Sequence, residues 1–414
     1  IGSVIAGVAN GTPMILIGRV FQGLGMSAIF PMIYIIIEHS FGAKEKGLVV
    51  GTIILFSGVG QSIGPTLGGL ITQQFGWRYV FLLNIPFCLI SFILILIKCK
   101  IDKQKTNEKI NYLNGIILII SIILIIGAIN ESHNWGVSNW KFISILIIGI
   151  IIFSINLYTQ KFLKNKIINL NLYSDPVYKS ITLVRAFFQF SISAFVFILP
   201  IYFQNGLGLT PTKSGLILLI MAITLAVSSP FIGKTVARAE SPKNPMIIGQ
   251  ILAFIGYLLI GFSLYNIAIN WYLLSIGLIC VGLNMSVIFN TTNKAAMHYV
   301  PKDQKGMGFG MFIANGFFNT SFGIALMGLI LSSISIHLFK THDITLNIKG
   351  DISHYINGSQ SVKLLGNMYP QDPEKIIKLG QTSFSYATSI CMWILSGLSL
   401  ISIIFCFHRK SKYS

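Results

Sequence analysis

The chain has 414 residues, of which 53% are hydrophobic and only 10% are charged, and its mean hydropathy is +0.75. Because soluble globular domains carry roughly 25% charged residues, this composition excludes a soluble domain and indicates an integral membrane protein. The net charge of +18 would favour nucleic-acid binding in a soluble protein, but here the charges lie between apolar segments, so no nucleic-acid partner is expected.

Apolar runs long enough to cross a hydrocarbon core of roughly 30 Å as helices recur along the chain. Residues 1–10 are too short to cross. Complete spans are expected at 13–38, 48–72, 79–97, 112–130, 142–159, 180–203, 212–233, 246–265, 271–292, 307–337 and 384–407. The predicted fold class is therefore all-α integral membrane protein, with about 11 complete transmembrane helices.

The first complete span contains Arg19-Val20-Phe21-Gln22-Gly23-Leu24-Gly25. A buried arginine costs about 2.5 kcal/mol or more on insertion scales, so it normally faces a wet cavity or a partner. This cost favours a functional role for Arg19.

The second span contains Phe56-Ser57-Gly58-Val59-Gly60-Gln61-Ser62-Ile63-Gly64-Pro65-Thr66-Leu67-Gly68-Gly69. Gly60, Gly64 and Gly68 recur every four residues on one helix face, where a neighbouring backbone can approach closely, and Pro65 bends the span. The pattern predicts a tight interhelical seam. The alternative is that these glycines only pack membrane helices, as small residues commonly do.

These phrases resemble motifs of the major facilitator superfamily. Residues 60–69 are similar to the antiporter motif G-x-x-x-G-P-x-x-G-G in the fifth helix of its exporters, residues 77–86 resemble the following loop and helix, and residues 19–25 resemble the fourth-helix motif R-x-x-Q-G-x-G. The resemblance implies that Arg19 and Gln22 face the cavity, that Arg19 takes part in proton coupling, and that a proton gradient supplies the energy in place of any cofactor.

The chain also resembles itself at an offset of 259 residues. The offset aligns Gly23, His39, Lys46, Gly47, Gly51, Ser62, Gly64 and Gly69 with Gly282, His298, Lys305, Gly306, Gly310, Ser321, Gly323 and Gly328. Both copies run in the same direction through the membrane, as in the parallel-related halves of major facilitator proteins.

The repeat predicts three parts. Residues 1–97 form the remainder of an N-terminal bundle (end of helix 3 to helix 6), residues 98–178 an inserted helix pair with cytoplasmic linkers, and residues 179–414 a C-terminal six-helix bundle with a long outer loop at 338–382. Residues 1–10 are then the outer end of a third helix in an N-terminally truncated chain. Six, two and six helices give the fourteen-helix drug:proton antiporter branch that the resemblance implies.

Basic residues gather in alternate loops, which sets the expected orientation. One side holds the lysines near Lys46, Lys166, Lys234 and Lys305, those of residues 98–109, and the C-terminal tail. The intervening short loops carry only Arg78, Lys141 and Lys213. The positive-inside rule therefore predicts a cytoplasmic C-terminus. The resemblance implies a multi-pass protein of the bacterial inner (plasma) membrane.

Polar residues inside the spans are the candidates for a binding cavity. Gln61, Gln189 and Asn315 are the polar candidates, with Phe187, Phe188 and Phe190 offering apolar surface. The alternative is that the amides only form interhelical hydrogen bonds. Arg185 likewise has two interpretations, a functional group or a side chain that snorkels to the interface.

The sequence thus predicts a transporter, and proton-coupled efflux of small amphipathic compounds or drugs is the favoured activity. The alternatives are an uptake symporter of the same fold and a truncated membrane protein that does not transport. The five cysteines lack paired spacing and no phosphate-binding loop or nucleophile elbow occurs, so neither metal nor enzymatic chemistry is expected. The expected partners are a small-molecule substrate and the lipid bilayer. Whether a periplasmic adaptor binds cannot be read from the sequence. No complete span has Asp or Glu near its middle to carry the proton.

Overall fold

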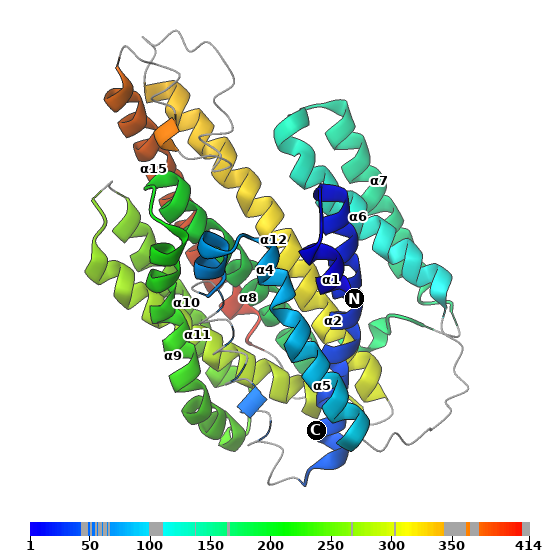
Figure 1. Cartoon of the computed structure of the whole chain (residues 1–414). Coiled ribbons are helices and arrows are strands. Elements are labelled where there is room, and N and C mark those ends of the chain that lie inside the picture. Colours follow the sequence, from blue (N-terminus) through cyan, green and yellow to red (C-terminus); the bar gives the residue numbers. More distant parts are fainter. Residues whose placement is uncertain are drawn as a thin grey trace.

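The computed structural model describes residues 1–42, 49, 52–53, 56, 60, 64, 67–98, 111–136, 138–163, 166–265, 268–301, 304–342, 362–364 and 372–407. All the elements in these residues are helices (Figure 1). Nine of the described helices are long and apolar enough to cross a membrane. The structure thus confirms an all-α fold with apolar helices of membrane-spanning length.

The N-terminal part begins with α1 (Gly2–Gly7) and α2 (Thr12–Ser40), followed by helical residues 67–74. The predicted span 79–97 is divided at Leu83 into α4 (Arg78–Leu82) and α5 (Asn84–Lys98). Pro86 lies in the first turn of α5, where its missing N–H costs no helix hydrogen bond. The side chains of α5 are exposed and mostly apolar, which suits a helix that faces lipid.

The inserted pair consists of α6 (Tyr112–Trp135) and α7 (Trp140–Thr159). Side-chain oxygens of Asn111 and Asn139 accept backbone N–H groups at the starts of the two helices, which fixes where each helix begins. Gly136 ends α6 with a φ of +83°, a conformation that favours glycine. After α7 the chain forms the short 3-10 helix η1 (Leu170–Ser174).

The described C-terminal bundle comprises six long helices and two short ones. Asp175 starts α8 by accepting two backbone N–H groups, and the π-helix η2 follows Pro200 near the end of α8. The elements are α8 (Pro176–Ile201), η2 (Tyr202–Gly206), α9 (Pro211–Arg238), α10 (Lys243–Leu264), α11 (Trp271–His298), α12 (Lys305–His342), η4 (Val362–Leu364) and α15 (Pro373–Ile404). The main hydrophobic core lies between these helices.

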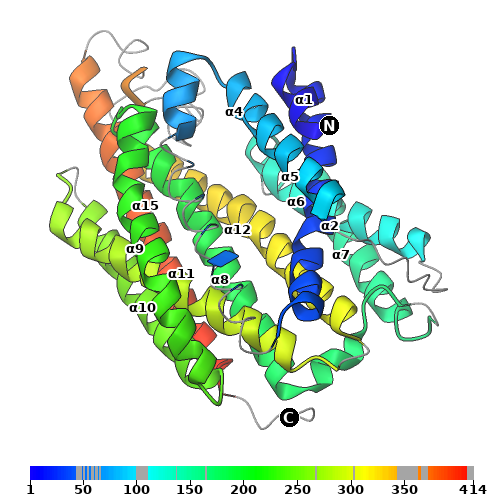
Figure 2. The ribbon, with the colours of Figure 1, turned by 60° about the horizontal axis from the view of Figure 1, so that its bottom comes forward.

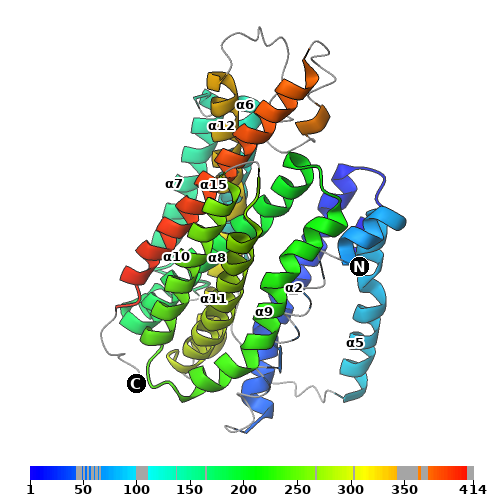
Figure 3. The same cartoon turned by 90° about the vertical axis from the view of Figure 1, so that its left-hand side faces the viewer.

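The helices are arranged with α12 at the centre. It packs against α8 of the C-terminal bundle on one side and contacts α2 and α6 on the others (Figures 1 and 2). Within the bundle, α10 packs between α11 and α15, and α9 packs on α11 (Figure 3). Because α12 contacts all three parts of the chain, it connects the inserted pair to the bundle.

Most predicted spans coincide with observed helices, and the differences lie at the ends. The predicted span 13–38 is α2, whereas 48–72 lies largely outside the described residues. Residues 338–342 and 373–382 are helical, so both helices continue into the segment expected to be an outer loop. Both extensions mix lysine and other polar residues with apolar ones, so they lack the continuous apolar run by which the spans were predicted.

Candidate functional site

A buried arginine lies where α8, α11 and α12 meet. Arg185 is only 7% exposed, and its Cζ atom lies 4.4 Å from the ring centroid of Phe289, 5.4 Å from Phe312 and 5.7 Å from Phe188. The guanidinium is therefore enclosed by phenyl rings and does not snorkel to the interface, which rejects that alternative. We call Arg185 with these three phenylalanines the arginine cage.

The cage joins three helices through electrostatic attraction. A cation over an aromatic face is attracted to the negative face of the ring, by about 0.5–1 kcal/mol at exposed sites and about 2 kcal/mol or more when desolvated. Phe188 comes from the next turn of α8, and its ring meets that of Phe289 edge to face with the centroids 5.1 Å apart. The sequence placed Phe188 among its candidates but missed Phe289 and Phe312. Their only signal is that they are aromatic residues in predicted spans.

Gln189 lies one turn beyond Arg185 on the same face of α8. A Cβ atom at Gly316 of α12 would be 3.7 Å from Arg185 Nε and 3.9 Å from Gln189 Cγ, so a glycine here borders both side chains. Gln189 Oε1 is buried and accepts no hydrogen bond from any described residue. A buried amide oxygen of this kind is an acceptor that a ligand can use.

The other C-terminal candidates have structural contacts. Asn315 Nδ2 donates to the carbonyl oxygen of Thr182 at 3.1 Å, which links α12 to α8. Phe187 stacks on Phe405 at 5.5 Å between centroids, and Phe190 packs against Phe322 at 5.9 Å. The structure therefore brings Phe188 and Gln189 to the arginine, while Phe187 and Phe190 pack elsewhere.

In the N-terminal part, Arg19 and Gln22 belong to one hydrogen-bonded chain. Arg19 Nη1 donates to Gln22 Oε1 at 3.3 Å, and Gln22 Nε2 donates to Ser3 Oγ at 3.0 Å. The Arg19 guanidinium also lies 4.8 Å from the ring centroid of Phe81. These contacts tie α2 to α1 and α4, although Arg19 itself is exposed.

The glycine-rich motif is described only in part, and Gln61 and Pro65 lie outside the described residues. Gly60 and Gly64 are exposed, and a Cβ atom on Gly60, Gly64 or Gly68 would meet no described atom within 4 Å. At Gly69, by contrast, a Cβ atom would be 3.1 Å from the carbonyl carbon of Pro211. The close approach between described residues therefore falls at Gly69.

This close approach at Gly69 joins the N-terminal part of the chain to α9 of the C-terminal bundle. Thr212, at the start of α9, donates its Oγ1 hydrogen to Gln73 Oε1 at 3.1 Å, one turn beyond Gly69. Figure 3 shows α9 on the side of the bundle that faces α2 and α5. The end of the glycine-rich helix is thus held against the C-terminal bundle.

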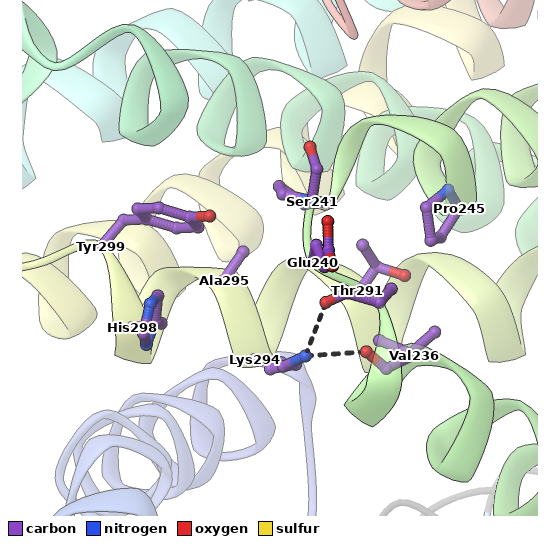
Figure 4. A pocket seen from close by; sticks show the side chains of 11 residues that line it. Val236, Glu240, Ser241, Pro245, Thr291, Lys294, Ala295, His298 and Tyr299 are labelled. Carbon is purple, nitrogen blue, oxygen red and sulfur yellow. Dashed lines mark hydrogen bonds between the residues drawn. The ribbon is translucent and has the colours of Figure 1, made fainter. Parts of the chain in front are cut away.

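A pocket of about 200 Å³ lies at the opposite end of α9, between the α9–α10 connection and α11 (Figure 4). There Lys294 Nζ donates to the carbonyl oxygens of Val236, Ala237 and Ala239 at 2.8, 3.0 and 3.3 Å. A cation at the carbonyl end of a helix satisfies groups that have no intrahelical partner and is favoured by the helix dipole. Lys294 therefore caps α9 from α11, a role that sequence reasoning missed.

One family model matches most of the chain. A model described as Major Facilitator Superfamily matches residues 1–184 and 181–339. Multidrug resistance protein Stp of Mycobacterium tuberculosis (strain ATCC 25618 / H37Rv) is 26% identical over 337 residues, which are 80% of this chain and 62% of Stp. The chain thus spans less than two thirds of the length of Stp.

Two further relatives are covered more fully. Multidrug resistance protein 3 of Bacillus subtilis (strain 168) is 25% identical over 388 residues, 92% of this chain and 72% of that protein. Riboflavin transporter RibZ of Clostridioides difficile (strain 630) is 26% identical over 367 residues, 87% of this chain and 77% of that protein.

A solved structure has the same fold. It is a bacterial homolog of the human lysosomal transporter Spinster, in an inward-facing and unoccupied conformation. The match has a TM-score of 0.54 and 14% sequence identity, and it covers 98% of this chain and 81% of that one.

Proposed function

Because the chain belongs to the major facilitator superfamily, we propose that it is a transporter that exports small amphipathic molecules, including drugs, by alternating access. Two of the relatives are named multidrug resistance proteins, which supports this activity. The observation that carries the proposal is the arginine cage. A charge among apolar membrane-spanning helices is expensive, and such charges characteristically mark substrate or ion pathways.

The cage and its surroundings suit a flat, partly polar molecule. The cage combines a buried cation with the phenyl rings of Phe188, Phe289 and Phe312, of which Phe188 and Phe312 are buried, and Gln189 Oε1 adds a hydrogen-bond acceptor near them. Binding sites for small molecules are lined mostly by apolar side chains, with a few polar groups that orient the ligand. The cage residues and Gln189 have this composition. We propose that substrate contacts the cage residues on α8, α11 and α12.

The proposed energy source is the proton gradient, with no cofactor. Entry of one proton supplies roughly 2.3 kcal/mol per 100 mV of membrane potential. Arg19, with its partner Gln22, is the proposed participant in coupling. The chain is a multi-pass membrane protein, and we propose the bacterial plasma membrane as its location, with the C-terminus in the cytoplasm.

Arg185→Met tests the cage in the full-length protein. We expect ethidium efflux to fall about tenfold, which corresponds to about 1.4 kcal/mol, because the variant removes the charge and its attraction to three rings. Arg185→Lys should retain part of the rate, since it keeps the charge but not the planar guanidinium. Lys179→Met, an exposed charge near the start of the same helix, is the matched control and should export at the wild-type rate. Unchanged efflux by Arg185→Met, at equal expression, would contradict the proposed site.

A second measurement distinguishes export from uptake, which the name of the riboflavin transporter relative keeps as the alternative. In inside-out vesicles whose interior has been acidified, an exporter that exchanges substrate for protons should make the interior more alkaline when substrate is added. An uptake symporter would not. A Cys label at the C-terminal tail tests orientation, because a cytoplasmic tail reacts with impermeant reagents only in inside-out vesicles.

A further inference from the structure

A cavity larger than the pocket beside Lys294 lies where the inserted pair meets α12. None of the four cage residues lines it. It has a volume of about 470 Å³ and is bounded by α6, α7, residues 167–173 and the first turns of α12. Among its lining side chains, only Tyr173 and Asn315 are polar, and the rest are apolar residues such as Leu118, Phe153 and Phe318. Its size lies within the range of small-molecule sites, and its lining suits a hydrocarbon ligand.

Small residues on α12 leave this space open. Gly306, Gly310 and Ala314 follow one another at intervals of four residues and all line the cavity. Such a stripe lets a neighbouring helix approach closely. Here no described atom lies within 4 Å of the position that a Cβ atom on Gly310 would take. The inserted pair therefore stands away from α12 at this level, although Ile125 and Ile129 of α6 pack on Ala325 further along.

Hydrogen bonds link the end of α7, the residues that follow it and the start of α12. Gln160 Oε1, just after α7, accepts the backbone N–H groups of Ile167 and Ile168 at 3.0 and 3.4 Å. Asn169 Nδ2 donates to Gln304 Oε1, immediately before α12, at 2.8 Å. We call residues 160–163 and 166–174 the strap, because their hydrogen bonds link the end of α7 to the residue before α12. Four residues of the strap line one wall of the cavity: Ile167, Ile168, Leu170 and Tyr173.

Three lysines lie close in sequence to the residues that line the cavity at the strap and at the start of α12. Lys166 and Lys305 directly precede the lining residues Ile167 and Gly306, and Lys161 follows the end of α7. The strap and the start of α12 belong to the side of the membrane with the basic loops, the proposed cytoplasmic side. Lysines next to an apolar cavity between membrane helices match the phosphate and the acyl chain of an anionic lipid.

We propose that this cavity binds an acyl chain of an anionic phospholipid from the leaflet on the basic-loop side, with Lys161, Lys166 and Lys305 around its phosphate. The phenol of Tyr173 in the cavity wall is neutral at physiological pH, and burial raises its pKa further, so it adds no charge that would repel the lipid. The proposal goes beyond transport, because lipid binding at this site does not depend on the nature of the substrate.

Native mass spectrometry of the full-length protein with added palmitoyl-oleoyl phosphatidylglycerol tests the site. We expect Gly310→Leu to lower the fraction of protein that retains one lipid by about tenfold, since the new side chain occupies the cavity. Ala314→Phe, a second lining position, should act in the same way. Gly397→Leu is the matched control, because Gly397 is a helical glycine of α15 with no described atom near its Cβ position and no part in the cavity.

The outcomes separate a lipid from other occupants. Equal lipid retention by the wild type, Gly310→Leu and Ala314→Phe would overturn the proposal. It would also be overturned if these variants lost bound ethidium but kept the lipid. Replacing Lys161 and Lys166 together with Ala should remove the preference for phosphatidylglycerol over phosphatidylcholine. A wild type that binds both lipids equally would refute the role of the lysines.

Discussion

We expect Gly323→Ala to weaken the contact between α8 and α12. A Cβ atom at Gly323 would lie 2.5 Å from the carbonyl oxygen of Phe190, 3.0 Å from Phe190 Cα and 2.9 Å from Ser193 Oγ. Two of these atoms belong to the backbone of α8, so no rotamer change can make room and the two helices must move apart. Overpacking of this kind costs typically about 1–3 kcal/mol.

The matched control lies on the same helix. Gly310→Ala adds the same methyl group where no described atom lies within 4 Å, and it replaces a poor helix former with a good one, which favours the helix by about 1 kcal/mol. Thermal unfolding in detergent, followed by tryptophan fluorescence at one scan rate, should therefore give a lower transition temperature for Gly323→Ala than for Gly310→Ala. Equal unfolding temperatures for the two variants would refute a steric conflict at Gly323.

Two further predictions concern the ends of α9. Gly69→Leu should slow efflux, because its side chain would push against the backbone of Pro211, whereas Gly68→Leu, with no described neighbour, should transport normally at equal expression. Lys294→Met should lower the transition temperature, because it removes the cap on α9, which is worth about 1 kcal/mol. The control is Lys234→Met, which replaces an exposed lysine of α9. Equal destabilisation by the two variants would contradict the capping role.

Hydropathy predicted the positions of the helices well because the thickness of the bilayer sets the length of each apolar run. It could not predict the break at Leu83 or the π-helix after Pro200, since neither interrupts the apolar pattern. It also assigned residues 338–342 and 373–382 to a loop because these helix extensions mix polar and apolar residues and are not continuously apolar.

The site was harder to predict than the fold. The sequence left Arg185 between a functional and a snorkelling interpretation, because two rings of its cage, Phe289 and Phe312, lie more than a hundred residues away along the chain. The glycine motif shows the same limit. Its spacing indicates a face suited to close packing, but only the fold could assign the contact with α9 to Gly69.

The internal repeat allows the surroundings of equivalent glycines in its two copies to be compared. Gly323 is the counterpart of Gly64 at the offset of 259 residues, and the two occupy different surroundings. Gly323 touches the backbone of α8, whereas Gly64 is exposed. Equivalent sequence positions in the two copies therefore do not imply equivalent contacts in the described structure.

The strap links the inserted pair to α12, so α7 can serve as a reference for measuring the movement of the N-terminal helices. Because Gln160 and Asn169 connect the end of α7 to the start of α12, the inserted pair shares a frame of reference with the C-terminal bundle. A spectroscopic probe on α7 should keep a constant distance to one on α12 throughout a transport cycle. A probe on α5 should change its distance to both, so α7 offers a stationary marker against which the movement of the N-terminal helices can be recorded.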